Sequence, residues 1–141
     1  MENNKIEVAA TIAAPVEKVW EQYTRPDHII QWNFADPSWH CPRASNDLRA
    51  GGKYSARMEA RDGSFGFDFE AIYDQVVDHR NLSYTMADGR QAITTFEPRD
   101  NATLVTTRFD PEGQNPREMQ QEGWQAILDN FKDHVQGSGR P

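Results

Sequence analysis

The chain has 141 residues, a length that supports one hydrophobic core and does not require a second domain. Its formal net charge of −7 argues against a nucleic-acid-binding surface, which needs clustered lysines and arginines to displace counterions from phosphates. The single cysteine, Cys41, excludes an intramolecular disulfide and fits a reducing compartment. Since no apolar run reaches the length of a signal-peptide core or a membrane span, we expect a soluble, cytoplasmic protein without membrane insertion.

The first forty residues predict one strand, two short helices and a loop. Residues 6–12 alternate between apolar and other side chains, as a strand with one buried face does. Pro15 suits the first turn of a helix, whose apolar face then carries Val16, Val19, Trp20 and Tyr23. Pro26 ends this helix, and residues 27–32 allow a further turn or two. Residues 33–42 follow neither period, and we expect a loop there.

Two Asp-Gly pairs predict tight β-hairpins, because a two-residue turn of type I′ needs positive φ at both central positions. Such a turn at Asp62-Gly63 places Arg57 opposite Asp68 on one face of the hairpin. The pairs on its other face are Met58 with Phe67, Ala56 with Phe69, and Tyr54 with Ala71.

The second turn, at Asp88-Gly89, places Tyr84 opposite Ile93 and Leu82 opposite Thr95 if it has the same geometry. In the strand between the two turns, aromatic residues alternate with acidic ones, so we expect the aromatic face to point inward. That face comprises Phe65, Phe67, Phe69, Ala71 and Tyr73. A last strand covers residues 103–109.

From Pro116 the apolar period changes to 3.6 residues, which predicts a long amphipathic helix. Its apolar stripe comprises Met119, Gly123, Trp124, Ile127, Leu128, Phe131 and Val135. A stripe of this length can lie across the aromatic face of the sheet, so the expected fold class is α+β. We expect a single domain over residues 1–136 and a disordered tail at 137–141, where small and polar residues dominate.

Four segments carry a resemblance to a known superfamily. They are residues 14–20 (APVEKVW), residues 47–54 (DLRAGGKY), the Asp62-Gly63 pair and residues 122–131 (EGWQAILDNF). In this order they resemble the START-like or SRPBCC superfamily, which has the helix-grip fold, and within it the bacterial branch similar to the activator of heat-shock protein 90 ATPase. The resemblance spans roughly residues 5 to 135.

The resemblance implies a curved antiparallel sheet of about seven strands wrapped round the C-terminal helix, with an apolar pocket between them. Members of the superfamily bind lipids or hormones, cyclise or aromatise polyketides, protect against aromatic natural products, or act as cochaperone domains. The fold is therefore implied more firmly than any one activity.

The residues expected to line this pocket come from the inner face of the sheet, the predicted loop and the helix stripe. They are Trp39, Tyr54, Met58, Phe67, Phe69, Tyr84, Met86, Trp124, Ile127 and Leu128. Each residue alone fits close core packing, because protein interiors have few voids. As a set they favour a pocket, since a phenol needs a hydrogen-bond partner and a thioether adapts its shape. The leading hypothesis is a binding protein for a small hydrophobic molecule, either aromatic or lipid-like.

The aromatic residues between Trp32 and Arg43 fit two interpretations: a lid over the pocket mouth, with Trp39 at the entrance, or a plug that closes the end of the core. His40 lies beside Cys41, but neighbours on a strand point to opposite faces and cannot form a nucleophile pair.

Two alternatives remain open. The first is a polyketide cyclase or aromatase-like enzyme that uses His40, Arg57, Glu59 and Tyr84, which requires these polar side chains to converge inside the pocket. The hairpin register instead places Arg57 and Glu59 on the outer face. The second is a stress-related interaction with a chaperone or another protein partner through the acidic surface. The spacing of histidines and cysteine predicts no metal site, and the glycines predict no nucleotide or other cofactor.

Overall fold

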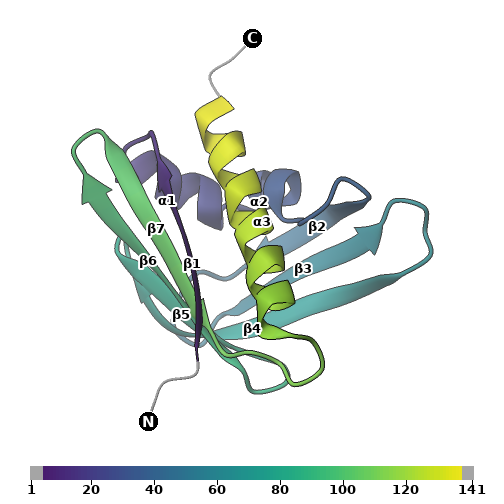
Figure 1. Cartoon of the computed structure of the whole chain (residues 1–141). Coiled ribbons are helices and arrows are strands. Elements are labelled where there is room, and N and C mark those ends of the chain that lie inside the picture. Colours follow the sequence, from purple (N-terminus) through teal and green to yellow (C-terminus); the bar gives the residue numbers. More distant parts are fainter. Residues whose placement is uncertain (1–4, 138–141) are drawn as a thin grey trace.

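A computed structural model of the chain describes residues 5–137 (Figure 1). Within this range the chain forms one sheet of seven strands and three helices. In chain order the elements are β1 (Ile6–Ile12), α1 (Val16–Thr24), α2 (Pro26–Trp32), β2 (Trp39–Asn46), β3 (Lys53–Ala60), β4 (Gly66–Val77), β5 (Asn81–Met86), β6 (Gln91–Arg99), β7 (Ala102–Phe109) and α3 (Arg117–Gly137).

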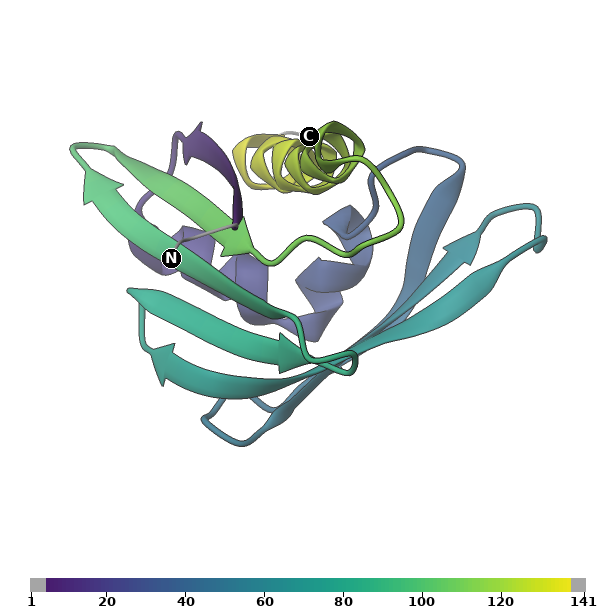
Figure 2. The same cartoon turned by 60° about the horizontal axis from the view of Figure 1, so that its bottom comes forward.

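The sheet is antiparallel throughout, and its strand order is β1-β7-β6-β5-β4-β3-β2. It curls around α3, which lies on its concave side (Figure 2). The register of the strand pairing shifts at two places, between His40 and Arg43 in β2 and between Tyr73 and Gln75 in β4. Such bulges increase the bend of a strand. The predicted α+β helix-grip fold is confirmed.

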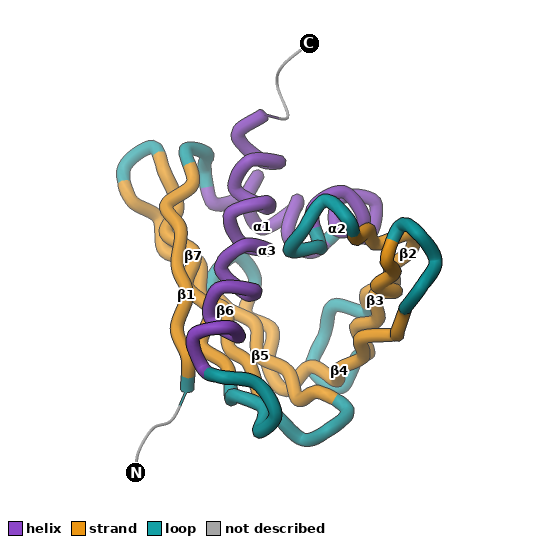
Figure 3. The backbone as a smooth tube through the Cα atoms, turned by 45° about the vertical axis from the view of Figure 1, so that its right-hand side comes forward, coloured by secondary structure: helices purple, strands orange, loops and turns teal. Residues whose placement is uncertain are grey.

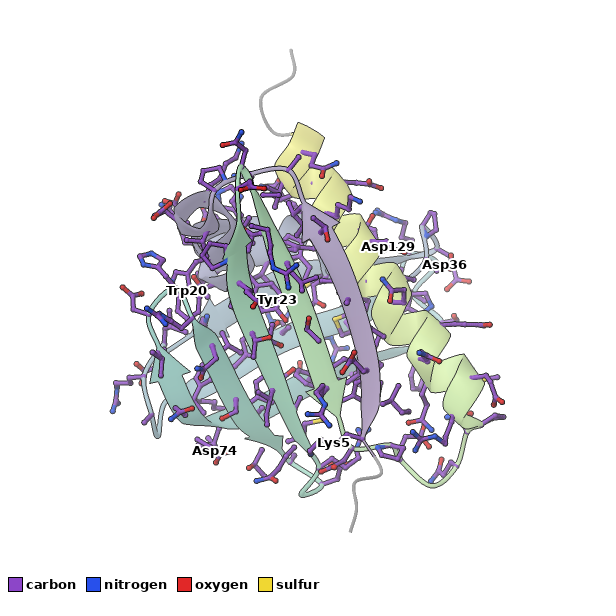
Figure 4. All side chains as sticks on the ribbon, turned by 60° about the vertical axis from the view of Figure 1, so that its left-hand side comes forward. Lys5, Trp20, Tyr23, Asp36, Asp74 and Asp129 are labelled. Carbon is purple, nitrogen blue, oxygen red and sulfur yellow. The ribbon has the colours of Figure 1, made fainter. Side chains whose placement is uncertain are left out.

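The helices α1 and α2 connect the two edge strands of the sheet, β1 and β2 (Figure 3). Pro15 occupies the N-cap of α1, where extended backbone is required, and its carbonyl accepts the first helical hydrogen bonds. Pro26 occupies the first position of α2, where the missing N–H has no role. The two prolines therefore place both short helices at one end of the curled sheet, where α2 packs against β2.

The core at this end is an aromatic cluster centred on Phe131 of α3. The ring of Phe131 lies 4.8 Å from that of Trp32 and 5.1 Å from that of Tyr23. The Trp32 indole donates a hydrogen bond of 3.0 Å to the Gln22 carbonyl, so its polar atom is satisfied. These contacts fix α1, α2 and α3 to one another.

The first hairpin has the predicted register: Met58 pairs with Phe67, and Arg57 pairs with Asp68. Its loop is longer than predicted, because Ala60 pairs with Phe65 through a backbone bond of 2.9 Å and four residues connect them. Gly63 has a positive φ of 79°, whereas the non-glycine residues with positive φ in the described chain are His79 and Asp100, not Asp62. A loop of four residues, one more on each side than the predicted loop of two, leaves the pairing of the strand residues unchanged.

The second hairpin has a different register from the predicted one: Tyr84 pairs with Ala92 and Leu82 with Thr94. The Met86 amide donates to the Arg90 carbonyl at 2.7 Å, so three residues form the turn, and Gly89 has a φ of 94°. Since a shift of one residue exchanges the two faces of a strand, Ala92 is buried and Ile93 is 38% exposed.

Three further predictions need correction. The expected loop over residues 33–42 is too long, because β2 begins at Trp39. Met119 is 57% exposed and is not part of the buried stripe of α3, which contains Leu128, Phe131 and Val135. Gly137, the first residue of the expected tail, is the last residue of α3. The rest of that tail, residues 138–141, lies outside the described residues.

Two histidines connect α2 to the end of α3. Nδ1 of His28 lies 3.0 Å from Nε2 of His134, a hydrogen bond in which one ring must be the donor and the other an acceptor. Burial lowers the pKa of His134, and the nearby charges of His28 and Lys18 act in the same direction. Both rings cannot be protonated without loss of this bond.

Phe131→Ala should destabilise the protein by about 3–5 kcal/mol, because it removes the ring at the centre of the aromatic cluster and leaves a cavity. Urea unfolding measures the change. Met119→Ala, in the exposed face of the same helix, is the control and should change the stability by less than about 0.5 kcal/mol. Equal effects of the two substitutions would contradict the assigned core.

The pH dependence of stability should contain a contribution from His134. Because its folded pKa is lowered, the unfolded chain takes up a proton first as the pH falls, so this contribution is complete above about pH 6.5 and is lost below it. His134→Gln removes the titration, and its stability should fall less than that of the parent protein between about pH 7.5 and 5.5. Urea unfolding across this range tests the prediction, and parallel pH profiles for the two proteins would refute it.

Candidate functional site

A cavity of about 280 Å³ lies between the concave face of the sheet and the helices. Its walls come from β1, β3, β4, β5, β7 and from all three helices. The lining residues are Val8, Tyr23, Trp32, Asn33, Tyr54, Met58, Phe67, Phe69, Tyr73, Leu82, Tyr84, Arg90, Thr107, Trp124, Ile127 and Leu128. Apolar and aromatic side chains dominate this set, as in other small-molecule sites.

Most of the residues that we expected to line the pocket are in the wall of this cavity. They are Tyr54, Met58, Phe67, Phe69, Tyr84, Trp124, Ile127 and Leu128. The structure places two of the expected residues elsewhere. Met86 is buried in the core beside the second turn, and Trp39 lies on β2 outside the cavity lining.

The aromatic rings of the wall contact each other across the strands. Tyr54 and Tyr84 are stacked, with ring centroids 6.1 Å apart and 7° between their planes. Phe69 meets both of them edge to face, at 5.8 and 5.9 Å. On the opposite wall, Trp124 of α3 stacks on Phe109 at 3.8 Å. A flat apolar ligand would therefore find rings on both sides.

Three of the tyrosine hydroxyl groups have hydrogen-bond partners. The Asn33 amide donates to the Tyr54 hydroxyl at 3.3 Å. The Tyr73 hydroxyl donates to Oδ1 of Asn46 at 2.8 Å. The Tyr23 hydroxyl lies 3.5 Å from that of Thr94, which in turn lies 2.8 Å from the Thr107 hydroxyl. These side chains give an apolar cavity a small number of fixed polar groups.

Burial raises the pKa of Tyr54 and of Tyr84 well above that of a free phenol. Burial also raises the pKa of Tyr23 and Tyr73. All four phenols are therefore protonated at neutral pH, and those whose proton is not already donated within the protein, as that of Tyr73 is to Asn46, can donate a hydrogen bond to a ligand.

Arg90 is a cavity residue that the sequence analysis missed. It pairs with Met86 across the second hairpin, and residues directly opposite on antiparallel strands have side chains on the same face. Met86 faces the core, so Arg90 projects to the concave side and reaches the cavity. A three-residue turn with Gly89 at the positive-φ position would have revealed this from the sequence. Tyr23, Trp32, Asn33 and Thr107 were also missed as lining residues.

The polar residues His40, Arg57 and Glu59 lie on the outer face of β2 and β3 and do not line the cavity. Nε of Arg57 donates to Glu59 at 2.8 Å, and His40 lies 3.7 Å from the same carboxylate. The Arg57 hydrogen bond lowers the pKa of Glu59. This arrangement is a partly exposed ion-pair group and does not bring the three side chains to a substrate pocket.

The aromatic residues between Trp32 and Arg43, for which we considered a lid or a plug, lie partly in a loop over residues 33–38 and partly in β2. Trp39 begins β2, and its ring contacts Phe65 at 5.9 Å and Phe67 at 6.2 Å. Phe65 is 61% exposed and Phe67 is 43% exposed, although we expected both to face the interior. Of the three, Phe67 lines the cavity, so this aromatic group borders it.

Other site chemistry is limited in the part of the chain that the structure describes. No group of three metal-ligating side chains occurs there. Cys41 is buried, its thiol donates to the Arg43 carbonyl at 3.5 Å, and burial raises its pKa, which disfavours a reactive thiolate. None of the described helices has the length and apolar character to cross a membrane.

Comparison with known proteins agrees with this architecture. Residues 13–136 match the family of the Activator of Hsp90 ATPase homolog 1-like protein. The chain is 40% identical to the AHSA1-like protein from Aeromonas hydrophila, with a TM-score of 0.90 over 96% of this chain and 94% of that one. A solution structure from Cytophaga hutchinsonii is 46% identical, with a TM-score of 0.83 over the same shares of the two chains.

A more distant solution structure, the Aha1 dimer from Colwellia psychrerythraea, is 16% identical and has a TM-score of 0.71 over 94% of this chain and 96% of that one. At this identity the similarity concerns the fold alone. A comparison with curated proteins found no match. The family match over most of the sequence, together with the relatives at 40% and 46% identity, shows that the chain belongs to the AHSA1-like family of the START-like superfamily.

Proposed function

We propose that the protein binds a small apolar molecule, aromatic or lipid-like, in the cavity between the sheet and α3. The observation that carries the proposal is the cavity itself: about 280 Å³ of space lined by rings, where a core usually packs closely. Affinity would come mainly from the apolar surface that the ligand removes from water. The family supports the same reading, because a hydrophobic pocket is typical of its fold.

The chemistry of the lining favours binding over proton transfer. None of the described residues that line the cavity is a carboxylate, an imidazole or a thiol, the groups that most often act as general bases. The polar groups are instead protonated phenols, an amide, a threonine hydroxyl and the guanidinium of Arg90. Such groups orient a bound molecule by hydrogen bonds.

The two alternatives from the sequence have weaker support. Of the four residues considered for a cyclase or aromatase-like reaction, Tyr84 lines the cavity, whereas His40, Arg57 and Glu59 lie outside it. A cochaperone-type or stress-related interaction is suggested by the family name and by the exposed rings of Phe65 and Phe67, which contact the half-buried Trp39. A pull-down with chaperones tests this second alternative separately from ligand binding.

Ile127→Trp should abolish the binding of a two-ring probe such as 2-naphthol, because the larger side chain fills the cavity that Ile127 lines. We expect the parent protein to bind 2-naphthol with a Kd on the order of 10–100 µM, and the variant at least about tenfold more weakly. Isothermal titration calorimetry measures both values. Ile127→Phe fills less of the space and should have an intermediate effect.

Asp133→Trp is the matched control, since it adds the same side chain to the exposed side of the same helix and should leave the affinity unchanged. Circular dichroism establishes that each variant is folded. The proposal fails if neither 2-naphthol nor an acyl compound such as octanoate binds to the parent protein. It also fails if Ile127→Phe and Ile127→Trp bind 2-naphthol as the parent does.

A further inference from the structure

Tyr84 differs from the other tyrosines of the cavity in the state of its hydroxyl group. The hydroxyl groups of Tyr23, Tyr54 and Tyr73 each have a hydrogen-bond partner. The described part of the chain provides the Tyr84 ring with aromatic neighbours and its hydroxyl with no hydrogen bond. Buried phenols generally find a partner, so an unpaired hydroxyl in a cavity wall is available to a ligand.

The strand register places Arg90 diagonally across from Tyr84. Tyr84 pairs with Ala92, and Arg90 precedes Ala92 by two residues, so Tyr84 and Arg90 are diagonal neighbours on the same face of β5 and β6. Diagonal neighbours lie within reach of long side chains. Both line the cavity, and the charge of Arg90 opposes the rise in the pKa of Tyr84 that burial causes.

The guanidinium of Arg90 is only partly used within the protein. Nε donates to Oδ2 of Asp88 at 2.7 Å, and 26% of the side chain is exposed. No other side-chain hydrogen bond of Arg90 occurs in the described structure. The N–H groups of its two terminal nitrogen atoms are therefore available to a ligand. Among the described residues that line the cavity, Arg90 is also the only one with a charge.

Of the carboxylates near Arg90, Asp88 bonds to Arg90 itself, whereas Asp110 and Glu112 have other donors. Asp88 accepts a bond from the Arg90 amide at 3.1 Å in addition to that from Nε. Asp110 is paired with Lys5 at 2.8 Å, and Glu112 accepts bonds of 2.6 and 2.9 Å from the amides of Gln114 and Asn115. These three carboxylates reduce the positive potential near Arg90, but none of them forms a hydrogen bond with its terminal nitrogen atoms.

We infer that Tyr84 and Arg90 form the head-group site of the cavity, and that its ligand is an aromatic carboxylic acid bound as the anion. The planar guanidinium matches the two oxygens of a carboxylate, and the phenol adds a third donor. The ring of the ligand would lie along the stacked wall of Tyr54 and Tyr84, opposite Trp124. This inference rests on the proposed function of the same cavity.

The cavity volume limits the size of such an acid. At about 280 Å³ the cavity lies near the lower end of the roughly 300–1,000 Å³ that is common for small-molecule sites. This space suits one or two fused rings with a short acidic group, whereas a long acyl chain would have to extend past Phe67 into solvent. A naphthalene carboxylic acid is therefore a suitable probe.

The test compares 2-naphthoate with two neutral molecules of the same shape, 2-naphthamide and 2-naphthol, by isothermal titration calorimetry at neutral pH. We expect 2-naphthoate to bind at least about tenfold more tightly than 2-naphthamide, since charge-assisted bidentate bonds are roughly twice as strong as neutral ones. Arg90→Gln should remove this preference while the affinity for 2-naphthamide changes less than about threefold. Tyr84→Phe should weaken the affinity for 2-naphthoate by about three- to tenfold and leave the affinity for 2-naphthamide nearly unchanged.

Two control variants separate local from general effects. Arg99→Gln removes the same charge at an exposed position of β6 and should keep the preference for 2-naphthoate. Asp88→Asn removes the internal partner of Arg90, retains the guanidinium, and should maintain or increase the affinity for 2-naphthoate.

The outcomes distinguish this inference from the proposed function. If 2-naphthol and 2-naphthamide bind but 2-naphthoate binds no better, the head-group assignment is wrong and the apolar cavity remains a binding site. The assignment is also wrong if Arg90→Gln keeps the preference for the anion, or if Arg99→Gln removes it. If none of the three compounds binds, this inference is overturned. If octanoate does not bind either, the proposed function is overturned with it.

Discussion

The structure depends on a mismatch in width between one helix and one sheet. Seven strands spaced about 4.8 Å apart form a layer about 29 Å wide, whereas a helix with its side chains is about 10–12 Å wide. Helix α3 packs beside β1 and buries Leu128, Phe131 and Val135 there. The far half of the sheet must curl back toward the helix, and α1 and α2 close only one end. The aromatic side chains of β3, β4 and β5 therefore contact each other instead of the helix, and the space in front of them remains.

The alternation of side chains along the strands then separates two kinds of chemistry. On β3, Arg57 and Glu59 point outward and pair with each other, while Ala56 and Met58 point inward. The outer face carries charges that water can solvate, and the inner face carries phenols whose pKa is raised by burial. A general base on the concave side would need a substitution at an inward position. The described residues of the cavity wall therefore offer phenols, an amide, a threonine hydroxyl and a guanidinium, and no carboxylate, imidazole or thiol.

How much of the structure could be predicted from the sequence depends on whether each residue was assigned to the correct face of its strand. The α+β class, the inward side of β3 and β4 and half of the residues of the cavity wall follow from periodicity and from the first hairpin, in which a four-residue loop leaves the same residues facing inward as a two-residue turn does. The curled sheet of seven strands was implied by the family resemblance. The second hairpin has a three-residue turn, so the predicted faces of β6 were exchanged and Arg90 was missed. Pro42 made residues 33–42 resemble a loop, but a bulge between His40 and Arg43 accommodates it within edge strand β2.

The pair Tyr84 and Arg90 is easier to explain by recognition than by stability. A phenylalanine at position 84 could keep the contacts with Tyr54 and Phe69 without a hydroxyl that needs a partner. The turn needs Gly89 for its positive φ and Asp88 to accept the backbone amide of residue 90, and neither requirement demands a guanidinium there. The Tyr84 hydroxyl and the terminal nitrogen atoms of Arg90, which make no hydrogen bond within the described structure, thus belong to residues that line the same apolar cavity. A ligand that places an anionic group between them satisfies both, and its rings occupy the space that α3 leaves uncovered.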